Sequence, residues 1–181
     1  MTKATWSLGP SDGDLRILTG VAGPAAKMGH RLTIGVTSWR ASVEWSDDRP
    51  VAVELTVPVD SIQVLGGEGG VTPLTGPEKA VARINALKTL EAKKYPEIRF
   101  TAEEISATAD GYRLTGLLEI HGTTRPRSVD LKVGDNGDSW AMALQASVSQ
   151  AEFGIKPYSL LMGTMRVADE VLVAFEGMHR K

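Results

Sequence analysis

The 181-residue chain contains no cysteine, which excludes disulfide bonds, thiolate zinc sites and cysteine nucleophiles. It also lacks an apolar run of the ~20 residues that a membrane-spanning helix needs, and residues 1–10 hold no apolar signal-peptide segment. Neither charge is in excess, because 20 Lys and Arg face 22 Asp and Glu, so a broad nucleic-acid surface is not expected. We therefore expect a cytoplasmic protein that does not span a membrane and has no nucleic-acid partner.

Signatures of catalysis and of metal binding are also missing. The three histidines, His30, His121 and His179, do not occur in the spacing of a metal-ligand motif, and no Gly-x-Ser-x-Gly motif marks a nucleophile. We interpret each histidine as a polar residue at the end of a strand, with His30 at the rim of the fold. The sequence thus predicts no metal site and no catalytic group, and we expect the protein not to be an enzyme.

Alternation of apolar and polar residues dominates the chain. In about eight runs, apolar side chains recur at every second position, as on a strand with one apolar face. Asp-Gly and Asn-Gly turns suit tight hairpins between antiparallel strands. The pattern predicts an all-β fold, either a sandwich or a barrel, and the length fits one domain over residues 1–181. The runs cover residues 32–36, 39–45, 51–64 with a break or bend at Pro58, 98–102, 112–120, 129–133, 140–148 and 171–175.

One segment follows a helical period. Thr75 and Glu78 are spaced as an N-cap and its capping-box partner, which predicts that a helix begins here. Apolar residues then recur at every third position over residues 81–90 and form a stripe on one face. We expect the helix to end before Tyr95, which precedes a proline, and to pack on the sheet or close one end of a barrel.

The Gly-Gly-Glu-Gly-Gly segment at residues 66–70 precedes this helix. A glycine-rich segment between a strand and a helix invites comparison with a phosphate-binding loop, but the Lys-Ser/Thr that completes such a loop is missing. We favour a mobile connection over a phosphate-binding loop. In a barrel, such a connection could cover the opening.

The large apolar side chains raise the question of what fills the barrel. Trp39, Phe100, Tyr112, Trp140 and Met142 all lie on the more apolar side of their runs. A barrel of about eight strands is either filled by its own side chains or leaves room for one ligand. The pattern leaves both possibilities open, and a filled core is the default.

Three short motifs stand out by their order and spacing. They are Tyr-Pro-Glu-Ile-Arg-Phe at residues 95–100, the strand and turn at residues 116–126, and Phe-Gly-Ile at residues 153–155. Together they resemble the YceI-like family of polyisoprenoid-binding proteins. The resemblance covers nearly the whole chain and is carried by Tyr95, Pro96, Ile98, Phe100, Gly116, Leu118, Gly122, Thr123, Pro126, Phe153, Gly154 and Ile155.

The resemblance implies a lipocalin-like antiparallel β-barrel of about eight strands with one packed or capping α-helix. It further implies that the barrel binds and carries or sequesters a long isoprenoid, either a polyprenyl alcohol or a quinone-type lipid, without catalysis and without a cofactor. His30 and Tyr158 are then expected to meet the head group. The expected cavity wall consists of Ile34, Trp39, Phe100, Tyr112, Leu114, Leu118, Trp140, Met142 and Leu144.

Two other functions remain open at this stage. A barrel with a solid core would serve as a protein-interaction or stress module. An enzyme acting on an isoprenoid amphiphile would use His30, Glu119 or His121 as its acid or base. Expected partners are the isoprenoid lipid, a membrane in transient contact, and a second copy of the chain paired through edge strands.

Overall fold

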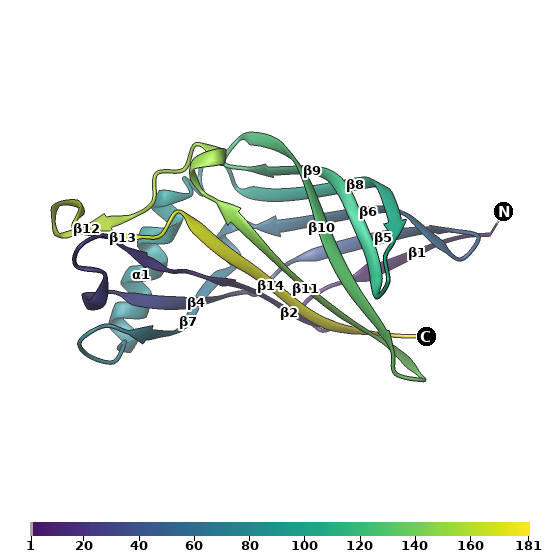
Figure 1. Cartoon of the computed structure of the whole chain (residues 1–181), viewed down its shortest axis with the longest axis horizontal. Coiled ribbons are helices and arrows are strands. Elements are labelled where there is room, and N and C mark those ends of the chain that lie inside the picture. The colour runs from purple at the N-terminus through teal and green to yellow at the C-terminus, as the bar shows by residue number, and fades with distance from the viewer. Residues whose placement is uncertain (1) are drawn as a thin grey trace.

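The chain folds mostly into β-strands, as the alternating pattern predicts. The computed structural model describes residues 2–181, and Figure 1 shows long strands that follow one axis, with a helix beside them. The strands are β1 (Lys3–Leu8), β2 (Gly13–Leu18), β3 (Val21–Ala22), β4 (His30–Val36), β5 (Arg40–Ser46), β6 (Arg49–Pro58), β7 (Ile62–Gly69), β8 (Glu97–Ala107), β9 (Gly111–Ile120), β10 (Thr123–Asp135), β11 (Ser139–Ser149), β12 (Ser159–Leu160), β13 (Met165–Val167) and β14 (Glu170–Arg180). The helical segments are η1 (Ala26–Met28), η2 (Val59–Ser61), α1 (Gly76–Thr89), η3 (Ala151–Phe153) and η4 (Leu161–Gly163).

Eleven strands within residues 2–181 form one antiparallel sheet. Their order is β1-β5-β6-β8-β9-β10-β11-β14-β2-β4-β7, and within the described residues β1 and β7 are not paired with each other. Side chains join β1 to an inner strand instead, because Trp6 of β1 stacks on His179 of β14 with ring centroids 4.1 Å apart. The result is a curled antiparallel sheet, which confirms the predicted antiparallel all-β fold but not its closure into a barrel of about eight strands.

The number of strands differs from the expected eight. The run over residues 51–64 is two strands, β6 and β7, because η2 turns the chain immediately after Pro58. The strands β1 and β2 were not expected at all. Each has six residues and few β-branched side chains, so pairing with neighbouring strands, and not local propensity, holds them in the sheet.

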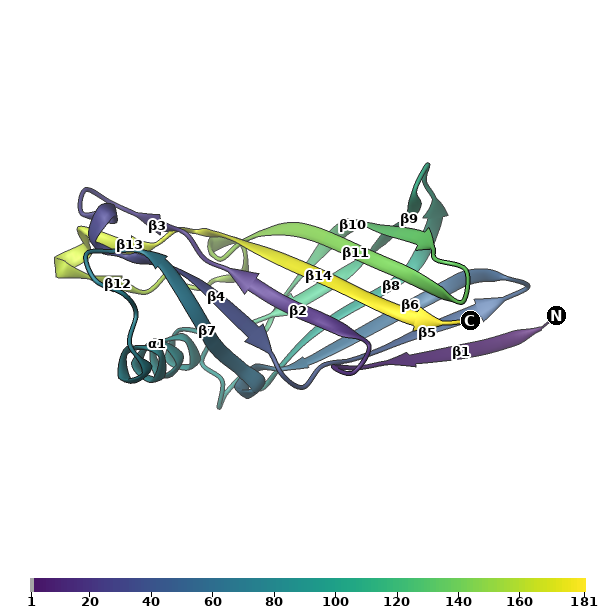
Figure 2. The same cartoon turned by 90° about the horizontal axis from the view of Figure 1, so that it is seen from below.

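The helix α1 begins where the sequence predicts. Thr75 is its N-cap, and its Oγ1 accepts a hydrogen bond of 3.3 Å from the backbone N–H of Glu78. Arg83 then ties the helix to the sheet by donating to the carbonyl oxygens of Asp60 and Ile62, at 2.6 and 2.8 Å. In Figure 2, α1 lies beside β7 at the end of the molecule away from the chain termini.

The predicted apolar stripe on α1 is only partly inward. Ile84 is 50% exposed, whereas Leu87 and Leu90 pack against the core. Ala82 and Ala86 also pack against it. Their short side chains let the helix lie close to the sheet, which a pattern of large apolar residues does not reveal.

The glycine-rich segment is a strand and not the mobile connection that we favoured. β7 continues to Gly69, and residues 66–69 pair with β4, with a register shift at Thr33/Ile34. The backbone hydrogen bonds to β4 hold the segment extended despite its glycines. Gly70 has a φ of +75°, and a Cβ placed there would lie 2.6 Å from the His30 Nε2, so glycine suits this position on both counts.

The three motifs of the family resemblance meet at one turn. His121 and Gly122 join β9 to β10 with φ angles of +54° and +70°, as in a type I′ hairpin turn. The Tyr95 ring packs on this turn, with its centroid 4.7 Å from that of His121. On the other side, the His121 Nδ1 lies 3.3 Å from the Phe153 carbonyl oxygen. The motifs therefore fix the turn, with Phe153 1% exposed beneath it.

A small second sheet lies at the same end as the helix. Its three strands have the order β12-β13-β3. Figure 1 places these strands beyond the main sheet, opposite the N- and C-termini. Among residues 2–181, no helix is both long and apolar enough to cross a membrane.

Candidate ligand-binding cavity

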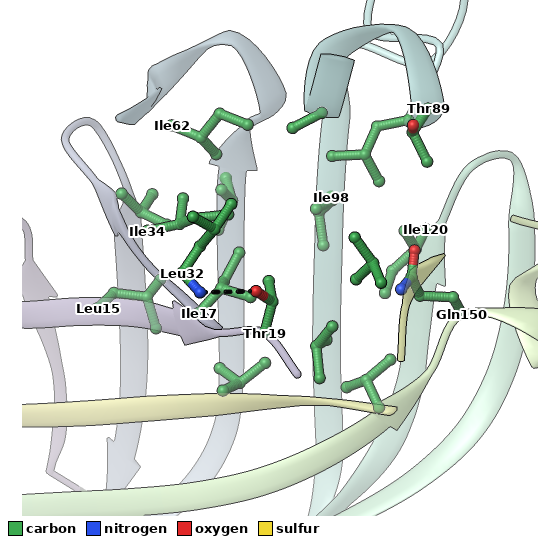
Figure 3. A pocket seen from close by; sticks show the side chains of 18 of the residues that line it. Leu15, Ile17, Thr19, Leu32, Ile34, Ile62, Thr89, Ile98, Ile120 and Gln150 are labelled. Carbon is green, nitrogen blue, oxygen red and sulfur yellow. Dashed lines mark hydrogen bonds between the residues drawn. The ribbon is translucent and has the colours of Figure 1, made fainter. Parts of the chain in front are cut away.

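A cavity of about 950 Å³ lies inside the curl of the main sheet. This volume is near the upper end of the ~300–1,000 Å³ range of small-molecule pockets. Alternate residues of nearly every main-sheet strand reach it, as expected where successive side chains point to opposite faces. Figure 3 shows β2, β4 and β7 on one wall and the end of α1, β8 and β9 on the other, with these labelled residues: Leu15, Ile17, Thr19, Leu32, Ile34, Ile62, Thr89, Ile98, Ile120 and Gln150.

Most of the residues that the sequence singled out reach this cavity. The inward members of β4, β8, β9 and β11 fall on the predicted side of their strands. Two further residues, His30 and Tyr158, lie at the end of the cavity near the small sheet. The nine that line it are His30, Ile34, Trp39, Phe100, Leu114, Leu118, Met142, Leu144 and Tyr158.

Tyr112 and Trp140 do not line the cavity. Tyr112 packs against the cluster around Phe100 and Leu114. Trp140 lies at the start of β11, where the Lys181 Nζ sits 4.3 Å from the centroid of its ring. Both residues lie on the side of their strands that faces the cavity elsewhere, but the cavity does not extend as far as these two positions.

Several lining residues were missed by the sequence reading. β1 and β2 supply Leu8, Leu15 and Ile17, and their alternation was present but short. From α1, Asn85 and Thr89 reach the cavity. Two polar residues in the second half of an amphipathic helix give no sequence signal of their own.

The polar groups on the wall are mostly held by other parts of the chain. The Thr19 Oγ1 accepts a 2.9 Å hydrogen bond from the Leu32 N–H. The His30 Nε2 lies 2.7 Å from the Thr72 carbonyl oxygen. The Gln150 Nε2 donates to the Ala168 carbonyl oxygen at 3.1 Å. These contacts leave a wall that is apolar to a ligand over most of its length.

Trp39 is the exception deep in the cavity. It is 4% exposed, and its ring packs on that of Phe175 in a T-shaped arrangement with centroids 5.5 Å apart. Its Nε1 finds no hydrogen-bond partner within the part of the chain that the structure describes. A buried donor of this kind costs ~1–3 kcal/mol when it stays unpaired. A ligand oxygen that reached this depth would meet a free donor.

Two arginines lie where the backbone pairing of β10 with β11 is interrupted in the cavity wall. Backbone pairing of β10 with β11 covers only Leu131 to Asp135 on the β10 side. Earlier along β10, Arg127 donates to the Ser147 carbonyl oxygen, and the Arg125 Nε donates to that of Glu152 at 3.0 Å. Arg127 also lines the cavity. Arg127 thus connects β10 to β11, and Arg125 connects β10 to η3, where the backbones of β10 and β11 part.

Asp169 organises the turn that carries Gln150. Its carboxylate accepts hydrogen bonds from the Ser149 hydroxyl at 2.5 Å and from the Ala151 N–H at 2.8 Å. These two donors lower the pKa of the Asp169 carboxyl below its usual value. The ionised carboxylate therefore fixes the turn between β11 and η3.

The candidate acids and bases do not assemble into one group. His30 is held at the cavity end by Thr72. The His121 Nε2 lies 2.5 Å from the Glu91 Oε2, and His121 is not part of the cavity wall. Glu119 is exposed on the opposite side of β9. Within residues 2–181, no three His, Cys, Asp or Glu side chains are grouped so that they could hold a metal ion.

Comparison with known proteins gives a consistent family. The sequence profile of the YceI-like domain matches residues 18–178. A UPF0312 protein of Pectobacterium atrosepticum is 26% identical over 101 residues, which cover 54% of this chain and 53% of that protein. Protein YceI of Escherichia coli is 24% identical over 95 residues, which cover 51% of this chain and 50% of that protein. The chain therefore matches about half the length of these relatives.

Solved structures extend the likeness to the whole fold. BcnA of Burkholderia cenocepacia superposes with a TM-score of 0.68 at 19% identity, over 92% of this chain and 96% of that chain. The YCEI protein of Campylobacter jejuni superposes with a TM-score of 0.60 at 14% identity, over 82% of this chain and 84% of that chain. At these identities the two structures establish a shared fold.

Proposed function

The chain belongs to the YceI-like domain family, and we propose that it binds a long apolar isoprenoid in its cavity and carries or sequesters it without catalysis. The ligand would be a polyprenyl alcohol or a quinone-type lipid. The YceI-like fold is a polyisoprenoid-binding fold. The observation that carries the proposal for this chain is the apolar cavity of about 950 Å³ inside the sheet.

The energetics of the cavity favour a long hydrocarbon. Each methylene that moves from water to an apolar interior gains ~0.8 kcal/mol. Ordering a flexible chain and losing translational freedom subtract from this gain. A ligand with many carbons still binds with few polar contacts, which fits a wall whose own polar groups are largely occupied.

The head group of the ligand is proposed to lie near His30 and Tyr158. Both residues are at the end of the cavity where the small sheet, α1 and the end of β7 meet. The isoprenoid tail would then run between Leu118, Met142 and Trp39 towards the far end. In this orientation the polar atoms of the ligand stay close to water, and no charge has to be buried.

The alternatives receive less support. A solid-core interaction module requires a filled interior, which disagrees with the cavity volume. An enzyme would need an acid and a base at one place, whereas His30 and His121 are engaged at separate positions. The proposal requires no cofactor beyond the lipid. A cytoplasmic location and a dimer through edge strands such as β1 stay predictions.

Calorimetric titration with prenyl alcohols of increasing length tests the proposal. We expect affinity to rise with each isoprene unit until the cavity is full, with the negative heat-capacity change of apolar burial. Straight-chain alcohols of equal carbon number serve as the matched comparison for shape. Absence of binding for every length would overturn the proposal and favour a role in protein interaction.

A further inference from the structure

Three segments surround the end of the cavity near the small sheet, and we call them together the mouth surface: residues 19–31, 65–79 and 156–168. Each contributes to the cavity wall, for example through Met28, Val71 and Leu160. They are also joined to one another, since β13 pairs with both β12 and β3 and His30 contacts Thr72. Figures 1 and 2 place this surface at the end of the molecule opposite both termini.

The mouth surface exposes large apolar side chains. The most exposed are Met162, at 104%, and Val71, at 77%. Met28, Leu160 and Leu161 are also 53%, 44% and 52% exposed. Isolated apolar residues on a surface need no explanation, whereas a contiguous group marks an interaction site.

The tip of the third segment is held in an unfavourable backbone conformation. Leu161 and Met162 have φ angles of +52° and +57°, which cost side-chain-bearing residues ~1–2 kcal/mol each. The two side chains sit on η4, between β12 and β13. A short tip with two consecutive exposed apolar side chains suits insertion into a soft apolar layer better than packing in the core.

Charge distinguishes the same surface from the rest of the molecule. The three segments hold five basic and two acidic residues, a net charge of +3, whereas the whole chain has −2, which leaves −5 elsewhere. One of the two acids, Glu68, faces Arg31 at 3.6 Å. Lys27, Lys156 and Arg166 form no ion pair with any residue in the described range 2–181.

We propose that the mouth surface docks on an anionic lipid bilayer. Leu161 and Met162 insert among the lipid head groups, while Lys27, Lys156 and Arg166 contact the phosphates. Exposed apolar groups flanked by basic residues are the combination that binds such an interface. An acidic protein partner would satisfy the charges, but it gives no reason for the cavity to open through the same surface. A bilayer does, because an apolar ligand could then pass between the two without crossing water.

The cysteine-free sequence allows a direct test. Met162→Cys carries an environment-sensitive dye at the tip, and Met178→Cys carries it on β14, where the native side chain is 53% exposed at the far end. Unilamellar vesicles of phosphatidylcholine, with or without phosphatidylglycerol, are added to protein stripped of lipid. We expect a blue shift and an intensity rise at position 162 only, with the anionic vesicles only, reversed by high salt.

Charge substitutions measure how much the basic residues of the mouth surface contribute to vesicle binding. Lys27→Gln and Lys156→Gln should each weaken vesicle binding about fivefold, as expected for one basic residue near an anionic surface. Lys132→Gln on β10 removes the same charge away from the mouth surface and should leave binding unchanged. If all three variants lost vesicle binding equally, net charge alone would explain the loss. That result would overturn the proposed orientation on the bilayer.

Failure of docking is separable from failure of the proposed function. The vesicles contain no isoprenoid and the protein starts without ligand, so a positive result needs no binding in the cavity. No dye response at position 162 with anionic vesicles, or equal responses at 162 and 178, would overturn the docking proposal and leave a protein partner as the occupant of this surface. Neither result would alter a titration with prenyl alcohols in solution.

Discussion

The two ends of the curled sheet are built from different chemistry. At the far end, where both termini lie, aromatic rings close the curl: Trp6 is 4.5 Å from Trp45 and 4.1 Å from His179, measured between ring centroids. Lys181 adds a 2.5 Å contact from its Nζ to the Asp135 carboxylate. The mouth surface has no such stack among the aromatic contacts of the described residues.

The difference indicates that the two ends of the sheet have different roles: one stabilises the curl and the other gives access to the cavity. Stacked rings at the far end hold together strands that the sheet order places far apart. Small residues, short strands and a helix at the mouth leave the interior reachable from one side. Ring stacking at one end and exposed lining residues at the other suit a long ligand that enters lengthwise from the mouth surface.

The largest predicted effect is on ligand binding, and it follows from a charge placed in the cavity wall between the two ends of the sheet. Leu118→Arg puts a guanidinium into the cavity wall, and burying an unpaired charge costs several kcal/mol. We expect prenyl alcohol binding to become undetectable by titration calorimetry. Leu117→Arg is the matched control, because Leu117 lies on the outer side of β9 and is 50% exposed. If both variants bound the ligand equally, the cavity would not be the site.

The next effect tests the closure of the far end. Trp6→Ala removes the ring that joins β1 to β14, and we expect the free energy of unfolding to fall by about 3 kcal/mol. Urea denaturation measures the loss, and Trp6→Phe should recover most of it. A change below about 0.5 kcal/mol, the range of ordinary surface substitutions, would show that the stack does not hold the sheet.

A smaller effect decides the orientation of the ligand. If the head group lies at the mouth, Tyr158→Phe should lower the affinity ratio of a prenyl alcohol to its parent hydrocarbon about fivefold, the worth of one hydrogen bond. Trp39→Phe should leave this ratio unchanged, although it removes the free indole donor. The opposite pattern would place the head group at the depth of Trp39.

The smallest effect concerns pH and the turn beside the mouth surface. Because the pKa of Asp169 is lowered in the folded protein, its stabilising contribution is present above the unfolded value of ~3.9 and is lost as pH falls through the folded value. Asp169→Asn should flatten this part of the dependence of the thermal midpoint on pH. A pH dependence of the thermal midpoint that is the same in Asp169→Asn and in the parent protein would contradict this account.

The sequence predicts well which side chains point to the inside of the fold. The reason is that side chains alternate between the two faces of each strand, whatever its neighbours are. Alternation places Leu114 and Leu118 on the apolar side of their strand, and both line the cavity in the structure. Alternation does not say how far a cavity extends along a strand, and Tyr112 and Trp140 do not line it although they lie on the same side of their strands as residues that do. That extent depends on how neighbouring strands curl and where Lys181 covers a ring, which no local pattern encodes.

Tertiary pairing explains the other differences between prediction and structure. Residues 66–69 are extended because β4 supplies their hydrogen bonds, although glycine disfavours strands in isolation. β1 is held by pairing with β5 and by the stack on His179. The contribution of Asn85 and Thr89 to the cavity wall follows from the docking of α1 on β7, which Arg83 fixes through long-range contacts.

Native mass spectrometry of the gently purified protein tests the central claim most directly. Organic extraction then identifies any lipid that the protein releases. The account predicts a stoichiometric adduct that extraction identifies as an isoprenoid, lost in Leu118→Arg and kept in Leu117→Arg. A protein of unmodified mass that stays unmodified after incubation with prenyl alcohols and quinones would contradict the account.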